Sequence, residues 1–169
     1  MFPGEYPYAH VFARRGIAPV PVLPLRMATA AKIVRRYMAA ESIVPSSAKL
    51  VFAAPYAARE VCDTVLELSG EVRYIALEVG RGEEELARML WRTRGVAVCG
   101  GEGAALRISF DPEEKASEHT LSICDPDVKV EYTLSDESIR EALLAALFRM
   151  GKAEREQIRV LSVSRSQAE

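Results

Sequence analysis

The chain has 169 residues, of which 49% are hydrophobic, enough for one well-buried core and too few for two domains of ordinary size. Its formal net charge of −2 supplies no positive field to hold a phosphate backbone, so we expect no nucleic-acid partner. The N-terminus lacks a basic segment followed by a long apolar one, and no apolar run approaches the roughly 18 residues of a membrane span. We therefore expect one cytoplasmic domain over residues 1–169 that does not bind membranes.

Three cysteines, Cys62, Cys99 and Cys124, are widely spaced and odd in number. Neither a disulfide framework nor the close pairs of a zinc site or a redox dithiol can be built from them. The sequence therefore indicates a reducing environment and no metal held by cysteine.

The first 25 residues are rich in proline and contain several aromatic residues. Proline cannot donate to a sheet ladder, so residues 18–25 are expected to form an extended edge strand or a polyproline-like segment. We interpret 1–25 as an N-terminal arm packed on the domain, with a surface that could dock on a second copy or on another protein.

Helical and strand patterns alternate after the arm. Residues 27–43 carry apolar side chains at helical spacing, namely Ala30, Ile33, Val34, Tyr37 and Met38. The chain then predicts strands at 49–55, 72–80 and 96–101, and helices at 56–70 and 82–95. Acidic residues begin the helix at 82–95 and arginines end it, which suits the helix dipole. Strands that alternate with helices of this length favour right-handed βαβ units and a parallel sheet.

The pattern changes after residue 103. Segments 104–114, 119–127 and 128–136 resemble short strands joined by Asp-Pro turns, which we interpret as an antiparallel extension of the sheet. A helix is expected over 135–151, with Ser135 or Asp136 as N-cap and Ile139, Leu143, Leu144 and Leu147 as its apolar stripe, followed by a last strand at 157–165. The fold class predicted is α/β, a three-layer αβα sandwich. Its mixed sheet has a Rossmann-like or flavodoxin-like parallel core and an antiparallel C-terminal extension.

Three loops follow predicted strands, at 53–58, 78–84 and 98–105. Ligands of open α/β sheets bind beyond the carboxyl ends of the strands, and glycines allow backbone N–H groups to approach an anion. The candidate ligand-binding residues are therefore Pro55, Tyr56, Gly80, Arg81, Gly82, Gly100, Gly101 and Gly103. The alternative is that "GGEG" at 100–103 is only a hairpin turn, and that Glu83–Glu85 neutralise the charge of Arg81.

Cys99 is the candidate catalytic nucleophile, because neighbouring glycine N–H groups would stabilise its thiolate. Its base would have to be His10 or His119, and the alternative is a small buried hydrophobe. Asp111, Asp125 and Asp127 could converge on a hard metal ion, although Asp-Pro is first a turn former. No metal site is therefore assigned, and no cofactor can be named.

Two segments resemble a known family. "KLVFAAPY" at 49–56 and "GVAVCGGEGAAL" at 95–106 are similar to the sensory domain of propionate-catabolism-type transcription activators, where one strand ends in Ala-Pro-Tyr and a later one in a glycine pair. Cys99 stands where that family has an arginine, and the first fifty residues have no counterpart. The resemblance implies a sensory role.

Three functions are compatible with the sequence. The first is binding of a small, anionic ligand at the strand ends, in a sensor or accessory role. The second is a hydrolase or transferase that uses Cys99 or the aspartates. The third is a non-catalytic interaction or assembly subunit that works through the N-terminal arm.

Overall fold

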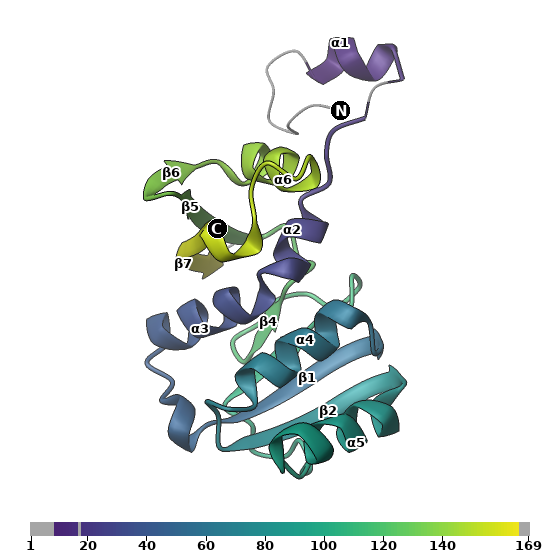
Figure 1. The fold of residues 1–169 in the computed structure, drawn as a ribbon, viewed down its shortest axis with the longest axis vertical. Helices are drawn as coiled ribbons and strands as arrows, with labels where there is room; N and C mark the ends of the chain where they lie inside the picture. The colour runs from purple at the N-terminus through teal and green to yellow at the C-terminus, as the bar shows by residue number, and fades with distance from the viewer. Residues whose placement is uncertain (1–8, 17, 166–169) are drawn as a thin grey trace.

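The computed structural model describes residues 9–16 and 18–165. Within the predicted arm, helix α1 (Ala9–Arg14) lies at the far end of the molecule from the parallel sheet (Figure 1). Helix α2 (Leu23–Ala28) begins inside the arm, so the expectation of extended chain is wrong for its last residues. Pro24 sits in the first helical turn, where its missing N–H costs no helical hydrogen bond. Residues 1–8, with most of the arm's aromatic side chains, fall outside the described residues.

The helix predicted over 27–43 is divided at Thr29. The chain leaves helical geometry there, and α3 (Ala30–Ala40) follows α2 in a new direction. The predicted apolar stripe of α3 is confirmed, because all five of its side chains are buried. Helix α3 packs on the last strand of the chain and on α4 (Arg59–Leu68).

A four-stranded parallel sheet forms the lower half of the molecule in Figure 1. Its strands are β1 (Lys49–Tyr56), β2 (Tyr74–Arg81), β3 (Leu106–Ser109) and β4 (Thr120–Ser122), in the order β2-β1-β3-β4. A short 3₁₀ turn at Pro45–Ser47 leads into β1, and α4 and α5 (Glu83–Arg94) follow β1 and β2. The α/β class and the parallel core are thus confirmed.

The strand predicted at 96–101 is reduced to one bridge, in which Val98 lies parallel to Ile75 on the outer side of β2. If this bridge is counted as a strand, β1 is central. Strand β2 and then the segment at Val98 lie on one side of β1, and β3 and then β4 lie on the other. This is the order of a doubly wound sheet, and the strand order reverses between β1 and β3.

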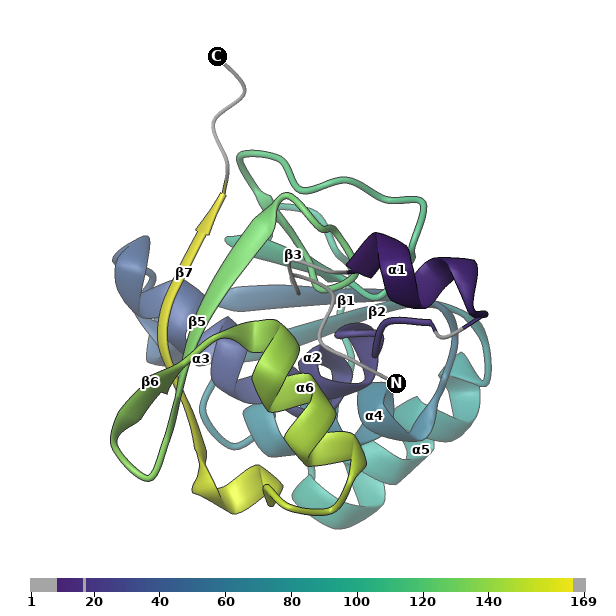
Figure 2. The ribbon, with the colours of Figure 1, turned by 90° about the horizontal axis from the view of Figure 1, so that it is seen from above.

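The two faces of the parallel sheet are covered differently. Leu50, Phe52 and their neighbours at alternate positions join the core under the helices. Figure 2 shows loops of the chain between α5 and β5 on the side of the sheet away from α4 and α5. There Gly101 crosses Val51 and Ala76, which pair with each other in β1 and β2.

The C-terminal strands form a separate antiparallel sheet, with the order β6-β5-β7. They are β5 (Val128–Leu134), β6 (Glu137–Ile139) and β7 (Ile158–Arg165). The expected extension of the first sheet is wrong in two respects: β3 and β4 pair in parallel, and the antiparallel strands join no strand of the first sheet. One continuous hydrophobic core nevertheless includes residues from both sheets.

Helix α6 (Glu141–Arg149) begins later than predicted. Ser135 and Asp136 both have positive φ and form the turn between β5 and β6, so neither caps the helix. A 3₁₀ turn at Arg155–Gln157 leads from α6 to β7. None of the helices in the described part of the chain is long and apolar enough to cross a membrane.

Candidate functional site

A cavity of about 140 Å³ lies at the carboxyl ends of β1, β3 and β4, where the strand order reverses. The end of β1 contributes Ala54, Pro55 and Tyr56, and the start of α4 contributes Ala58 and Val61. Pro55 ends the apolar part of β1, and the chain then turns into α4. The cavity therefore occupies the position at which open α/β sheets bind ligands.

The second wall of the cavity comes from segments far apart in the sequence. Phe110 and Pro112 follow β3, Cys124 follows β4, and Leu23 and Met27 project from α2. The lining is predominantly apolar. Tyr56 is 61% exposed, so it lies at the rim with its ring available to a ligand.

Cys124 contributes a thiol to the cavity lining. Its thiol donates a hydrogen bond to the carbonyl oxygen of Phe110 at 3.4 Å. Burial, and secondarily the negative charge of Asp111, raise the pKa of this thiol. Cys124 is therefore protonated at neutral pH and is poorly suited to act as a nucleophile.

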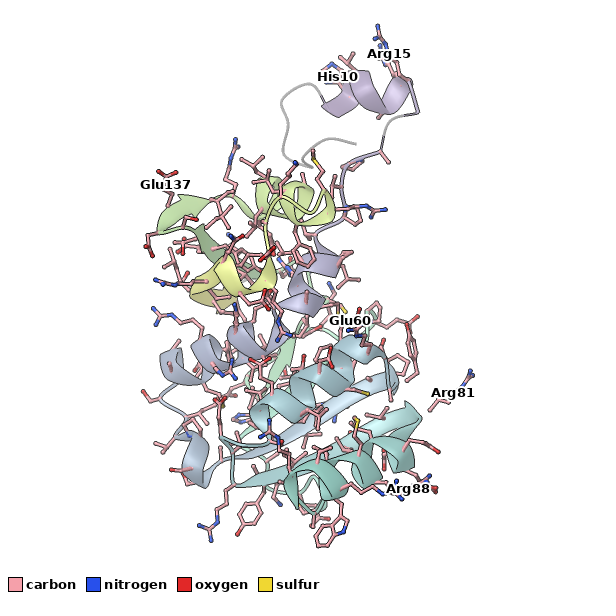
Figure 3. The ribbon with its side chains drawn as sticks, viewed as in Figure 1. His10, Arg15, Glu60, Arg81, Arg88 and Glu137 are labelled. Carbon is pink, nitrogen blue, oxygen red and sulfur yellow. The ribbon has the colours of Figure 1, made fainter. Side chains whose placement is uncertain are left out.

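The first turn of α4 adjoins the cavity and has no side-chain cap, because its N-cap residue is Ala58. Figure 3 shows Glu60 in this turn, close to α2. The free N–H groups of a helix start carry partial positive charge and favour a negatively charged group nearby. An acidic ligand with an apolar body would fit both features.

Two hollows of about 320 Å³ each lie elsewhere. One is between α2, α4 and α6, and the other is between α3 and β7. Arginines in both hollows already have carboxylate partners, since Arg59 pairs with Asp63, and Arg35 pairs with Glu67 and Glu71. We therefore place the candidate site in the smaller, apolar cavity.

The predicted residues at 80–82 adjoin this site without lining it. A Cβ on Gly80 would lie 2.6 Å from the carbonyl oxygen of Pro55, and one on Gly82 would lie 3.0 Å from the Cβ of Ala57. These glycines allow the ends of β1 and β2 to approach each other. Arg81 is exposed and points away from the body of the molecule (Figure 3), and the described residues give it no ion pair with Glu83–Glu85.

The glycine-rich segment lies elsewhere. Gly101 crosses the sheet at the middle of β1 and β2, and Lys49 donates hydrogen bonds to the carbonyl oxygens of Gly100 and Glu102. Gly103 has a φ of +67°. The segment is neither a hairpin turn nor a loop at the carboxyl edge; it carries the chain across the face of the sheet from Val98 to β3.

Cys99 is half-buried at the edge of β2, and its thiol donates to the carbonyl oxygen of Ile75 at 3.3 Å. Neither histidine is hydrogen-bonded to it among the described residues. His10 lies on α1 at the opposite end of the molecule (Figure 3), and His119 is exposed beside β4. A catalytic role for Cys99 stays a prediction.

Two of the three aspartates accept hydrogen bonds from backbone N–H groups. Asp111 accepts from the N–H of Glu113, and Asp125 accepts from the N–H groups of Ala116 and Asp127. Across residues 9–16 and 18–165, no group of three or more histidine, cysteine, aspartate or glutamate side chains is placed to hold a metal ion.

The sequence analysis overlooked Arg26 and Glu141. Arg26 is only 5% exposed, and its guanidinium donates to both carboxylate oxygens of Glu141. Burial opposes the charge of Arg26, but the hydrogen bonds and charge of Glu141 outweigh burial and raise the pKa of the guanidinium. A single arginine inside the apolar run "VLPLRMATAA" was the available signal, because a charge in such a run needs a buried partner.

Comparison with known proteins identifies no relative: no protein-family model matches the chain, and no curated protein or solved structure is similar enough to count as a match. The resemblance of 49–56 and 95–106 to a sensory domain gains no support from these comparisons. The geometry of the cavity is therefore the basis for a function.

Proposed function

We propose that this chain binds a small organic acid in the cavity at the ends of β1, β3 and β4, in a sensor or accessory role. The observation that carries the proposal is an apolar cavity at the point where the strand order reverses. The uncapped start of α4 supports a negatively charged group on the ligand.

The size of the cavity limits the ligand. A cavity of about 150 Å³ holds a group the size of benzene, whereas nucleotides need several times that volume. Aromatic or short branched carboxylic acids fit this limit, with the apolar part against Phe110 and Met27 and the carboxylate toward α4.

The test measures the binding of benzoate, 3-methylbutanoate, benzamide and AMP. Calorimetry gives the affinity of each compound, and thermal unfolding gives the midpoint of the chain in its presence. We expect saturable binding and a higher midpoint with the two acids, weaker effects with neutral benzamide, and none with AMP. No binding by either acid, or equal binding by benzamide, would contradict the proposal.

Two variants locate the ligand. Leu23→Trp places an indole over the cavity from a partly exposed rim position and should abolish binding, and Tyr56→Ala should weaken it. Leu143→Trp on α6 and Tyr74→Ala on β2 alter side chains of the same kinds and similar exposure away from the cavity. Their affinity should equal that of the unaltered chain; an equal loss in the controls would place the ligand elsewhere.

A further inference from the structure

Two walls of the cavity, α2 and the segment after β4, meet at the side chain of Arg26. Leu23 and Met27 line the cavity from α2, and Arg26, which lies between them in sequence, is buried without lining the cavity. Its guanidinium donates to Glu141 on α6 at 2.7 and 2.8 Å. The cavity wall and α6 are therefore joined through one buried side chain.

The same guanidinium also holds the wall that carries Cys124. It donates to the carbonyl oxygens of Asp125 at 2.7 Å and Val128 at 2.8 Å. Asp125 directly follows Cys124 and is itself 3% exposed. The distance between α2 and Cys124 is thus fixed by hydrogen bonds to Arg26, outside the cavity.

Removing one partner of a buried ion pair strongly destabilises the structure around it, because the remaining charge is left buried without an opposite charge. Glu141 supplies the only carboxylate that the described residues place in hydrogen-bond contact with Arg26. Helix α2 has six residues and is separated from α3 at Thr29.

We propose that the pair formed by Arg26 and Glu141 controls access to the cavity and couples it to α6 and the antiparallel sheet. The pair keeps α2 against the segment after β4, and displacement of α6 releases both walls. This regulation concerns the same cavity and therefore rests on the proposed function. Arg26 is a positioning residue that does not touch the ligand.

The thiol of Cys124 reports on the walls without any ligand. N-ethylmaleimide is added to the folded chain at fixed pH, and labelling of each cysteine is measured by peptide mass spectrometry. In Glu141→Gln and in Arg26→Lys, labelling of Cys124 should rise about tenfold, the change produced by about 1.4 kcal/mol less free energy of local opening. Cys62 and Cys99 are internal controls and should keep their rates.

Glu67→Gln is the matched control, because Glu67 also accepts from arginine side chains, those of Arg35 and Arg155, away from the cavity. It should leave Cys124 unchanged. An unchanged Cys124 rate in both test variants overturns the inference, and so does a parallel rise at all three cysteines, which would indicate general loss of structure.

Benzoate separates this inference from the proposed function. Where benzoate binds, it should protect Cys124, and both test variants should weaken its affinity about tenfold. If benzoate and 3-methylbutanoate fail to bind, the proposed function fails, but the labelling rates without ligand still decide whether the pair holds the walls together.

Discussion

Gly80 allows the ends of β1 and β2 to lie unusually close. An added Cβ would stand 2.6 Å from the backbone oxygen of Pro55, which cannot rotate away. Gly80→Ala should therefore lower the free energy of unfolding by about 1 to 3 kcal/mol, as overpacking does. Urea denaturation measures this change in the free energy of unfolding. Gly70→Ala is the control, since a Cβ there meets nothing within 4 Å; equal stability of the two variants would contradict the close approach.

Gly103 requires a left-handed backbone, and Gly100 does not. Gly103→Ala should cost about 1 kcal/mol of stability, Gly103→Asn less, because asparagine tolerates positive φ, and Gly100→Ala nearly nothing. None of the three should change the affinity for benzoate, because this segment lies across the sheet from the cavity. Thermal unfolding and calorimetry on the same samples measure both quantities. Loss of affinity with unchanged stability would instead support the glycines as a binding loop.

At the scale of elements, α3 protects the edge strand β7. Lys32 donates to the carbonyl oxygens of Arg155 at 2.6 Å and Ile158 at 2.7 Å, and Arg36 donates to that of Leu161. Burial, and then the charge of Arg155, lower the pKa of Lys32. Side chains on carbonyl groups of an edge strand hinder pairing with another chain.

Lys32→Met should therefore destabilise the fold by about 2 kcal/mol, because two carbonyl groups lose their donor. The midpoint of urea unfolding measures the loss. Lys152→Met removes an exposed lysine and is the control. If both variants unfold at the same midpoint, the contact between α3 and β7 depends on apolar packing alone.

At the scale of the whole molecule, the turn at Asp125 joins the parallel sheet to the antiparallel one. Burial alone would raise the pKa of Asp125, but the N–H groups of Ala116 and Asp127 and the ammonium of Lys115 outweigh it and hold the pKa below its ordinary value. The folded state therefore binds this proton less readily than the unfolded chain. Its contribution is complete at neutral pH and is lost as the pH falls through the lowered value.

Asp125→Asn should reduce stability at pH 7, and the difference from the unaltered chain should shrink as the pH falls below about 4. Urea unfolding at a series of pH values measures this difference. Asp127→Asn alters a neighbouring exposed carboxylate and should have little effect at any pH. A difference for Asp125→Asn that stays constant with pH would mean that its effect comes from packing instead of charge.

From α3 to α5, the sequence by itself determined which segments are helices and strands. The signals were local: the apolar stripe of α3, the apolar run of β1 and the charges at the two ends of α5. The spacing of apolar residues along a short segment indicates whether it forms a helix or a strand. Pro55 and Tyr56 were placed at a strand end for the same reason, and they line the cavity.

Only the tertiary structure decided which strands pair and which side chains form the site. The residues of a strand indicate how far it is buried. Its backbone N–H and C=O groups can bond to a parallel or an antiparallel neighbour, so the direction of β3 and β4 had no local signal. The glycines at 100–103 acquired their role from the sheet face beneath them. Arg26 meets Glu141 across 115 positions of sequence, and Cys124 lines the same cavity as Leu23. Contacts of that kind are made by packing, which no local pattern encodes.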